Sequence, residues 1–301
     1  LPCVAFVNNL NSTLAQERAD VVVPLRCGPE IAVPATKSFI NQLALLYGLG
    51  HRLGLQRKRD VGPHADLPRL LSDALASTQV AVDAAAEELY LDPSMHLLAT
   101  RLSAVAMEGA LKIREVVLNH TEGFEGSEFK HGRNTILGFN TIFGPAGVEA
   151  LLERVAKDVE AGAGGDAVRA ALGTHIDALY SDYPLVFVTG PAERDVDLTI
   201  SQIHTHKIRG AKVIVVAEEN ERLRAAASGV PAGREDYRHV YIALPPTGDT
   251  TQTVFTATVA LQLLALAMSN KKRAYLDALG VPEHGVHPDV PKNVSKSITV
   301  D

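Results

Sequence analysis

The run MHLLAT at residues 95–100, followed by LSAVAMEGALKIREVVLN at residues 102–119, decides the fold. The first segment is a short apolar run, and the second places apolar residues around most of a helix circumference. Three further apolar runs lie at residues 184–189, 211–217 and 239–244, separated by helical patterns. Uniformly apolar strands that alternate with helices are typical of a parallel sheet covered on both faces. The sequence therefore predicts an α/β fold of doubly wound parallel sheets flanked by helices.

A shorter version of this alternation precedes the charged hinge at residues 56–66, with apolar runs at 3–8 and 21–25 and an apolar helix at 40–55. We expect residues 1–60 to form the C-terminal part of a first domain. Residues 61–280 should form a second domain with an insert near 138–183, and residues 281–301 an extended tail that closes over the active site. Because Leu1 is followed at once by an apolar run, we expect the chain to be a fragment and the first domain to be incomplete.

Composition argues against several partner classes. The chain has 301 residues and a formal net charge of -6, which gives no broad electrostatic attraction to nucleic acid. Cys3 and Cys27 have no metal-ligand or disulfide spacing, so we expect reduced thiols in a cytoplasmic protein. No apolar run reaches the ~18 residues that suggest a membrane span, so no membrane partner is expected. No metal or cofactor motif appears, and we expect neither.

The helix at 102–119 carries a charged stripe, since Glu108, Lys112 and Glu115 fall at i, i+4 and i+7. One interpretation is an exposed face with surface ion pairs. The other is a polar cavity, because the rest of the helix is apolar and unpaired buried charges are costly. A carboxylate in such a cavity can act as an acid and base.

Two other places could carry chemistry. His131 lies in a polar loop soon after the charged helix, and a histidine can move a proton on and off a sugar ring oxygen. The tail PKNVSKSITVD at 291–301 contains Lys296, and a lysine held near a carbonyl can form a Schiff base. His204 and His206 lie two residues apart on an expected helix, so they make a poor metal pair.

Four segments together resemble one family in the order in which that family has them. They are GPEIAVPATKSF at 28–39, EGALKIRE at 108–115, GSEFKHG at 126–132 and KNVSKSITVD at 292–301. They are similar to motifs in the isomerase half of glucosamine-6-phosphate synthases. The resemblance covers nearly the whole chain and implies two sugar isomerase (SIS) domains, the first of them incomplete.

The resemblance also implies roles in converting fructose 6-phosphate to glucosamine 6-phosphate. Glu115 would shuttle a proton between C1 and C2 of the open-chain sugar, with Lys112 supporting charge near the intermediate. His131 would assist ring opening, reaching the neighbouring subunit's site in a homodimer. Lys296 would form an imine with the substrate. The substrate-binding residues implied are Val33, Ser295 and Glu108.

Departures from the family leave alternatives open. The phosphate-binding Ser/Thr loops and the N-terminal glutaminase domain have no counterpart in this sequence, and the stretch from 138 to 183 is far longer than the family's link. Arg133 stands where the family usually has Pro, and Thr100-Arg101-Leu102 where it has a glycine-flanked Arg. One alternative is a SIS-type glucosamine-6-phosphate deaminase, and another is a non-catalytic sugar-phosphate-binding protein.

Overall fold

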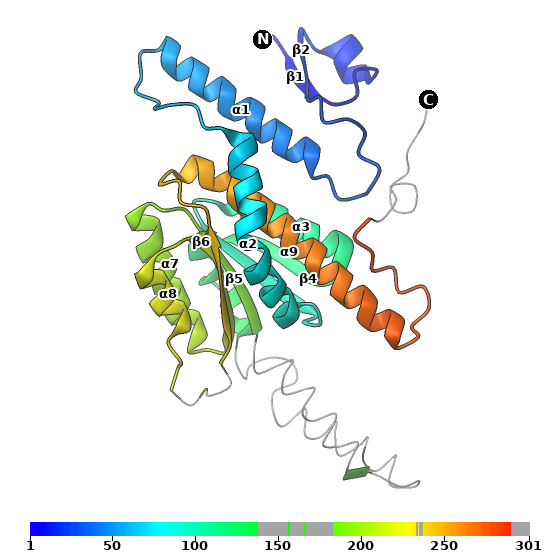
Figure 1. Ribbon diagram of the computed structural model, residues 1–301, viewed down its shortest axis with the longest axis vertical. Helices are drawn as coiled ribbons and strands as arrows, with labels where there is room; N and C mark the ends of the chain where they lie inside the picture. The colour runs from blue at the N-terminus through cyan, green and yellow to red at the C-terminus, as the bar shows by residue number, and fades with distance from the viewer. Residues whose placement is uncertain (138–155, 157–164, 167–182, 233, 235–236, 290–301) are drawn as a thin grey trace.

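The computed structural model describes residues 1–137, 156, 165–166, 183–232, 234 and 237–289. Its centre is a five-stranded parallel sheet in the order β4-β3-β5-β6-β7 (Figure 1). In this order β4 lies at one edge of the sheet, and β3, which precedes it in the chain, lies between β4 and β5, as in other doubly wound folds. The strands are β3 (Ser94–Thr100), β4 (His120–Glu125), β5 (Tyr183–Thr189), β6 (Ala211–Glu218) and β7 (His239–Leu244).

Helices cover both faces of this sheet, as its apolar strands require. One face packs against α2 (Leu67–Leu89), α3 (Ser103–Val117) and α9 (Thr250–Ala278). The other face packs against α7 (Glu193–Lys207), α8 (Glu221–Ser228) and the short α4 (Gly126–Phe129). Every residue of β5 and β6 is buried. The predicted α/β fold with a parallel, helix-flanked sheet is therefore confirmed.

Local signals set where the helices begin. Asp66 caps α2 by accepting a hydrogen bond from the Arg69 amide at 3.3 Å, and Asp249 caps α9 by accepting one from the Thr251 amide at 2.7 Å. The helix α9 continues to Ala278, well beyond the apolar run VALQLLALAM at 259–268. Its length and composition would allow it to span a membrane, yet 67% of its most apolar window is buried in the fold.

One strand was missed. The polar sequence of residues 121–135 predicts a loop, whereas β4 pairs with β3 in parallel along its whole length. This strand lies at the edge of the sheet and has polar, half-exposed side chains, which hide it from a search for apolar runs. Gly123 lets it approach α3, since a Cβ there would lie 2.4 Å from the backbone nitrogen of Met107.

The first part of the chain forms a smaller unit at one end of the molecule (Figure 1). Its strands β1 (Val4–Val7) and β2 (Val21–Pro24) pair in parallel, and α1 (Lys37–Gln56) follows. Between β1 and β2, Leu14–Arg18 form a five-residue π-helical turn. The domain boundaries at 60 and 280 stay predictions. The expected insert near 138–183 lies almost entirely outside the described residues.

Candidate active site

The charged stripe of α3 is buried. The ammonium of Lys112 lies 2.7 Å from a carboxylate oxygen of Glu115 and 3.6 Å from one of Glu108. The Lys112 side chain is only 4% exposed, and those of Glu108 and Glu115 are 10% and 17% exposed. The interpretation as an exposed ion-paired face is therefore wrong. The three groups form a buried ionic cluster. Such clusters add little net stability to a fold, and they are common at functional sites.

The environment of this cluster acts most strongly on Glu108. Burial raises the pKa of Glu108, and the nearby ammonium of Lys112 offsets only part of the rise. The negative charges of Glu115 and Glu30 raise it further. A carboxyl group with a raised pKa can hold or release a proton closer to neutral pH than an exposed one.

The position of α3 is fixed by α9. The Ser269 hydroxyl of α9 donates to the Val116 carbonyl at 2.7 Å, and the Lys272 ammonium donates to the Val117 carbonyl at 2.9 Å. These bonds satisfy carbonyls that the end of a helix leaves free. Nearer the middle of α3, a Cβ at Gly109 would lie 2.6 Å from Leu261, so glycine allows the two helices to touch. The helix that carries the ionic cluster is held at both places.

The segment between β2 and α1 contributes to the same place. Glu30 accepts hydrogen bonds from the Ser38 hydroxyl and, at 2.8 Å, from the Thr36 amide. Burial alone would raise the pKa of Glu30, but hydrogen bonds from Ser38 and from the backbone amides of residues 36–38 together lower it. Val33 is 7% exposed and precedes Pro34, which faces the cavity described next.

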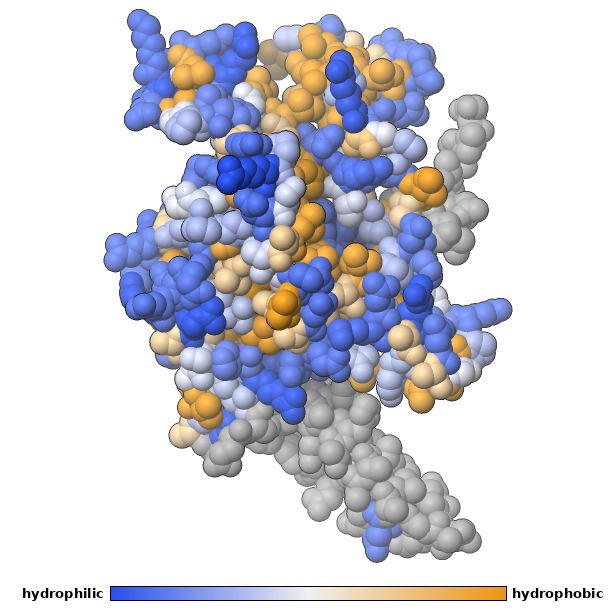
Figure 2. Space-filling model, in the orientation of Figure 1, coloured by the Kyte–Doolittle hydropathy of each residue, from blue (hydrophilic) through white to orange (hydrophobic). Residues whose placement is uncertain are grey.

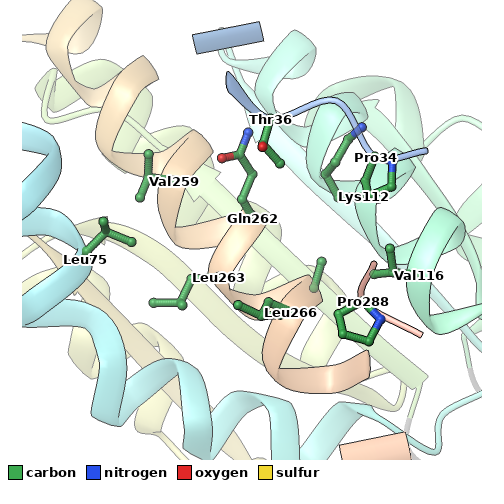
Figure 3. Close-up of a pocket in the computed structure, with 11 residues that line it drawn as sticks. Pro34, Thr36, Leu75, Lys112, Val116, Val259, Gln262, Leu263, Leu266 and Pro288 are labelled. Carbon is green, nitrogen blue, oxygen red and sulfur yellow. The ribbon is translucent and has the colours of Figure 1, made fainter. Parts of the chain in front are cut away.

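A cavity of about 260 Å³ lies between α3, α9, α2 and this segment (Figure 3). Most of its wall is aliphatic, and its polar side chains are Thr36, Lys112 and Gln262. Figure 3 shows the ends of the Thr36, Lys112 and Gln262 side chains at the same end of the cavity. The remaining lining residues are Pro34, Leu75, Val116, Val259, Leu263, Ala265, Leu266 and Pro288.

Thr36 and Gln262 were missed as site residues. Thr36 lies inside the segment GPEIAVPATKSF at 28–39, in which only Val33 was predicted to bind substrate. Gln262 is the one polar residue in the apolar run VALQLLALAM at 259–268, and an isolated polar residue in such a run is a usable signal for a cavity wall.

His131 does not join the ionic cluster within one chain. It is exposed and follows α4, beyond the end of β4, whereas Glu115 lies near the end of α3, just before β4 begins. The strand β4, about 20 Å long, lies between the end of α3 and the segment that carries His131. The adjacent Arg133 stacks its guanidinium on the Phe124 ring at 4.1 Å from the centroid.

Ser295 and Lys296 lie outside the described residues. The described chain leads toward them past Pro288, which lines the cavity. His204 is exposed and His206 is buried, so this pair does not converge on one point, as expected. Among the described residues no group of three His, Cys, Asp or Glu side chains could hold a metal ion.

Comparison with known proteins relates the chain to one group of enzymes. No family model matches the chain. Glutamine–fructose-6-phosphate aminotransferases (isomerizing) align along its whole length. The enzyme of Rhizobium meliloti is 28% identical over 99% of the chain and 40% of its own length. That of Corynebacterium efficiens is 30% identical over 99% of the chain and 39% of its own length. The chain is homologous to the C-terminal SIS isomerase region of these aminotransferases.

Solved structures agree on the fold. The C-terminal domain of the aminotransferase from Francisella tularensis superposes with a TM-score of 0.62 at 19% identity, over 90% of this chain and 63% of that one. The tagatose-6-phosphate ketose/aldose isomerase of Escherichia coli gives a TM-score of 0.58 at 14% identity, over 95% and 62%. The resemblance drawn from four motifs is confirmed, and the chain spans about 40% of the length of the aminotransferases that it matches.

Proposed function

We propose that this SIS region carries out the isomerase half of an enzyme that converts fructose 6-phosphate and ammonia into glucosamine 6-phosphate and water. The observation that carries the proposal is the burial of Lys112 between two carboxylates on the wall of a cavity. Aldose–ketose isomerisation needs a carboxylate that can move a proton and a nearby cation that stabilises the negative charge of the intermediate. The homology with aminotransferases that act on fructose 6-phosphate supports this choice of substrate.

The proposed reaction begins at the substrate carbonyl. The amine of Lys296 adds to C2 of the open-chain ketose and water leaves, which gives an imine that holds the substrate. Ammonia then adds to C2 and the lysine amine leaves, so that C2 carries the new nitrogen as an imine. No electrons enter or leave in either step.

Proton transfer completes the reaction. Glu115 removes a proton from C1, the C–H electron pair forms a C1–C2 double bond, and the nitrogen gains a proton. Return of a proton to C2 and loss of the C1 hydroxyl proton give the amine at C2 and the aldehyde at C1. The ammonium of Lys112, 2.7 Å from Glu115, stabilises charge at this intermediate.

We also propose that the working enzyme is a homodimer. His131 opens the sugar ring in the second copy's site, because within one chain β4 separates it from Glu115. Glu108, Val33 and Ser295 contribute to sugar binding. We further propose that a separate part of the full-length protein supplies the ammonia, as the greater length of the relatives suggests.

The free thiols of Cys3 and Cys27 suit a cytoplasmic enzyme.

The test is an ammonia-dependent assay of glucosamine 6-phosphate formation by the full-length protein, combined with calorimetric titration of fructose 6-phosphate. Glu115→Gln should lower turnover by about 10³-fold while substrate binding changes little and the protein stays folded at the assay temperature. The matched control is Glu87→Gln, which removes an exposed carboxylate paired with Lys271 and should leave the rate unchanged. A near-normal rate for Glu115→Gln, or wild-type binding without turnover, would contradict the proposal.

A further inference from the structure

The carboxamide of Gln262 is incompletely satisfied. Its nitrogen is buried and has no hydrogen-bond partner in the part of the chain that the structure describes. Turning the amide over would bury the oxygen, an acceptor, in the same place. A buried polar atom without a partner costs free energy, which a bound ligand can recover.

The packing of α9 places Gln262 at the cavity. Gln262 follows Leu261 and precedes Leu264, which are at most 1% exposed and anchor α9 against the sheet and α3. The side chain therefore stays on the cavity wall, pointing to the end that also holds Thr36 and Lys112 (Figure 3).

The charge around this end selects the kind of group that can lie there. Lys112 is already paired with two carboxylates, Glu108 and Glu115, and Glu30 adds negative charge nearby. A phosphate would be repelled by this balance of charge, whereas neutral hydroxyl groups could bind to an amide and a threonine hydroxyl. The opposite, aliphatic part of the wall offers no polar partner.

We propose that Gln262 is a specificity-determining residue that hydrogen-bonds one hydroxyl of the sugar and so places the hydroxylated, non-phosphate end of the substrate beside Lys112. This inference rests on the proposed function, because it presumes a sugar-phosphate ligand. It assigns the Gln262 amide to recognising one hydroxyl position.

The experiment compares the full-length wild type with Gln262→Met, which keeps the side-chain length but cannot form the bond. Fructose 6-phosphate and its analogues lacking one hydroxyl each are titrated calorimetrically. The wild type should bind one analogue about 10- to 100-fold more weakly than the parent sugar. Gln262→Met should bind fructose 6-phosphate more weakly than the wild type does, by the same factor. It should no longer distinguish fructose 6-phosphate from the analogue that lacks this one hydroxyl. The control Gln79→Met changes an exposed glutamine on α2 and should behave as the wild type does.

Thermal unfolding gives a second readout. Gln262→Met removes a buried unsatisfied atom, so the variant without sugar should unfold at a higher temperature than the wild type and gain less from added sugar. Undiminished discrimination by Gln262→Met, or equal weakening toward every analogue, would overturn the role of Gln262 while leaving the proposed function intact. A wild type that binds no hexose phosphate would overturn both.

Discussion

The first 56 residues and the five-stranded sheet bury their apolar side chains to very different extents. No residue of α1 is buried, and Leu46, Leu49 and Leu53 are 52%, 45% and 43% exposed. Figure 2 shows apolar surface gathered over β1 and β2, where Val4 and Val21 are about half exposed. The strands β5 and β6, by contrast, have no exposed residue.

This difference bears on where the site lies. The sheet has its own core, whereas the first 56 residues depend on what they pack against. The cavity forms where the two meet, with Pro34 and Thr36 from the first region facing Lys112 and Gln262 from the second. The candidate site thus lies at the border of a well-buried unit and a weakly buried one, where a ligand can add packing that the chain alone lacks.

The largest expected effect is in the rigid unit. Gly123→Ala forces a methyl group to within 2.4 Å of the Met107 backbone, and backbone atoms cannot move aside as a flexible side chain can. We expect a loss of about 3 kcal/mol or more in the free energy of unfolding, measured by urea denaturation. A loss below 1 kcal/mol would mean that β4 and α3 separate easily, and that the sheet is not much more tightly packed than the first 56 residues.

Acid should also act on the rigid unit. Burial lowers the pKa of both His96 and His206 to about 4, from 6.5. Between pH 6.5 and 4 the unfolded chain therefore binds protons that the folded chain does not bind. The free energy of unfolding is highest above pH 6.5 and falls as the pH drops toward 4, by up to about 3 kcal/mol for each histidine.

Urea denaturation at several pH values measures this slope. His206→Met removes one titrating group from its contact with the Phe129 and Phe187 rings, so the slope between pH 6.5 and 4 should become shallower. An unchanged slope would assign the acid sensitivity to other groups.

At the border, two isosteric changes should act in opposite directions. Glu115→Gln removes the nearer partner of Lys112 and should destabilise the fold at pH 7 by about 1–3 kcal/mol. Glu108→Gln removes a carboxylate whose pKa burial has raised, so its ionisation opposes folding as the pH rises. Glu108→Gln should therefore stabilise the fold at neutral pH and have little effect at pH 4. Destabilisation by both variants at pH 7 would show that Lys112 needs both partners.

The smallest effect is expected in the first region. Gly50 lies within α1, and a Cβ there would meet nothing within 4 Å. Gly50→Ala should stabilise the helix by at most about 1 kcal/mol, through helix propensity alone. Slower amide hydrogen exchange along α1 would measure this, with no change expected in β5 or β6. A destabilising result would reveal a partner that covers this face of α1.

Much of the fold could be predicted because β5 and β6 contain the unbroken apolar runs PLVFV at 184–188 and VIVVA at 213–217. β4 could not, since its sequence HTEGFE lacks that pattern and its pairing depends on β3 and α3. At the site, helical spacing predicted that Glu108, Lys112 and Glu115 share one stripe. Their burial depends on α9 and on residues near 30–36, which are distant in sequence, and so spacing alone favoured an exposed face.

Because α9 is one continuous helix, the directions in which its side chains point are fixed relative to one another. Its 29 residues form one rod about 44 Å long. Phe255 meets the Tyr47 ring of α1 near one end, and Gln262, seven residues later, faces the cavity from the same side after two turns. One residue inserted between them would rotate Gln262 by about 100° relative to Phe255. The rotation between Phe255 and Gln262 along this one helix therefore determines whether α9 can contact α1 and line the cavity at the same time.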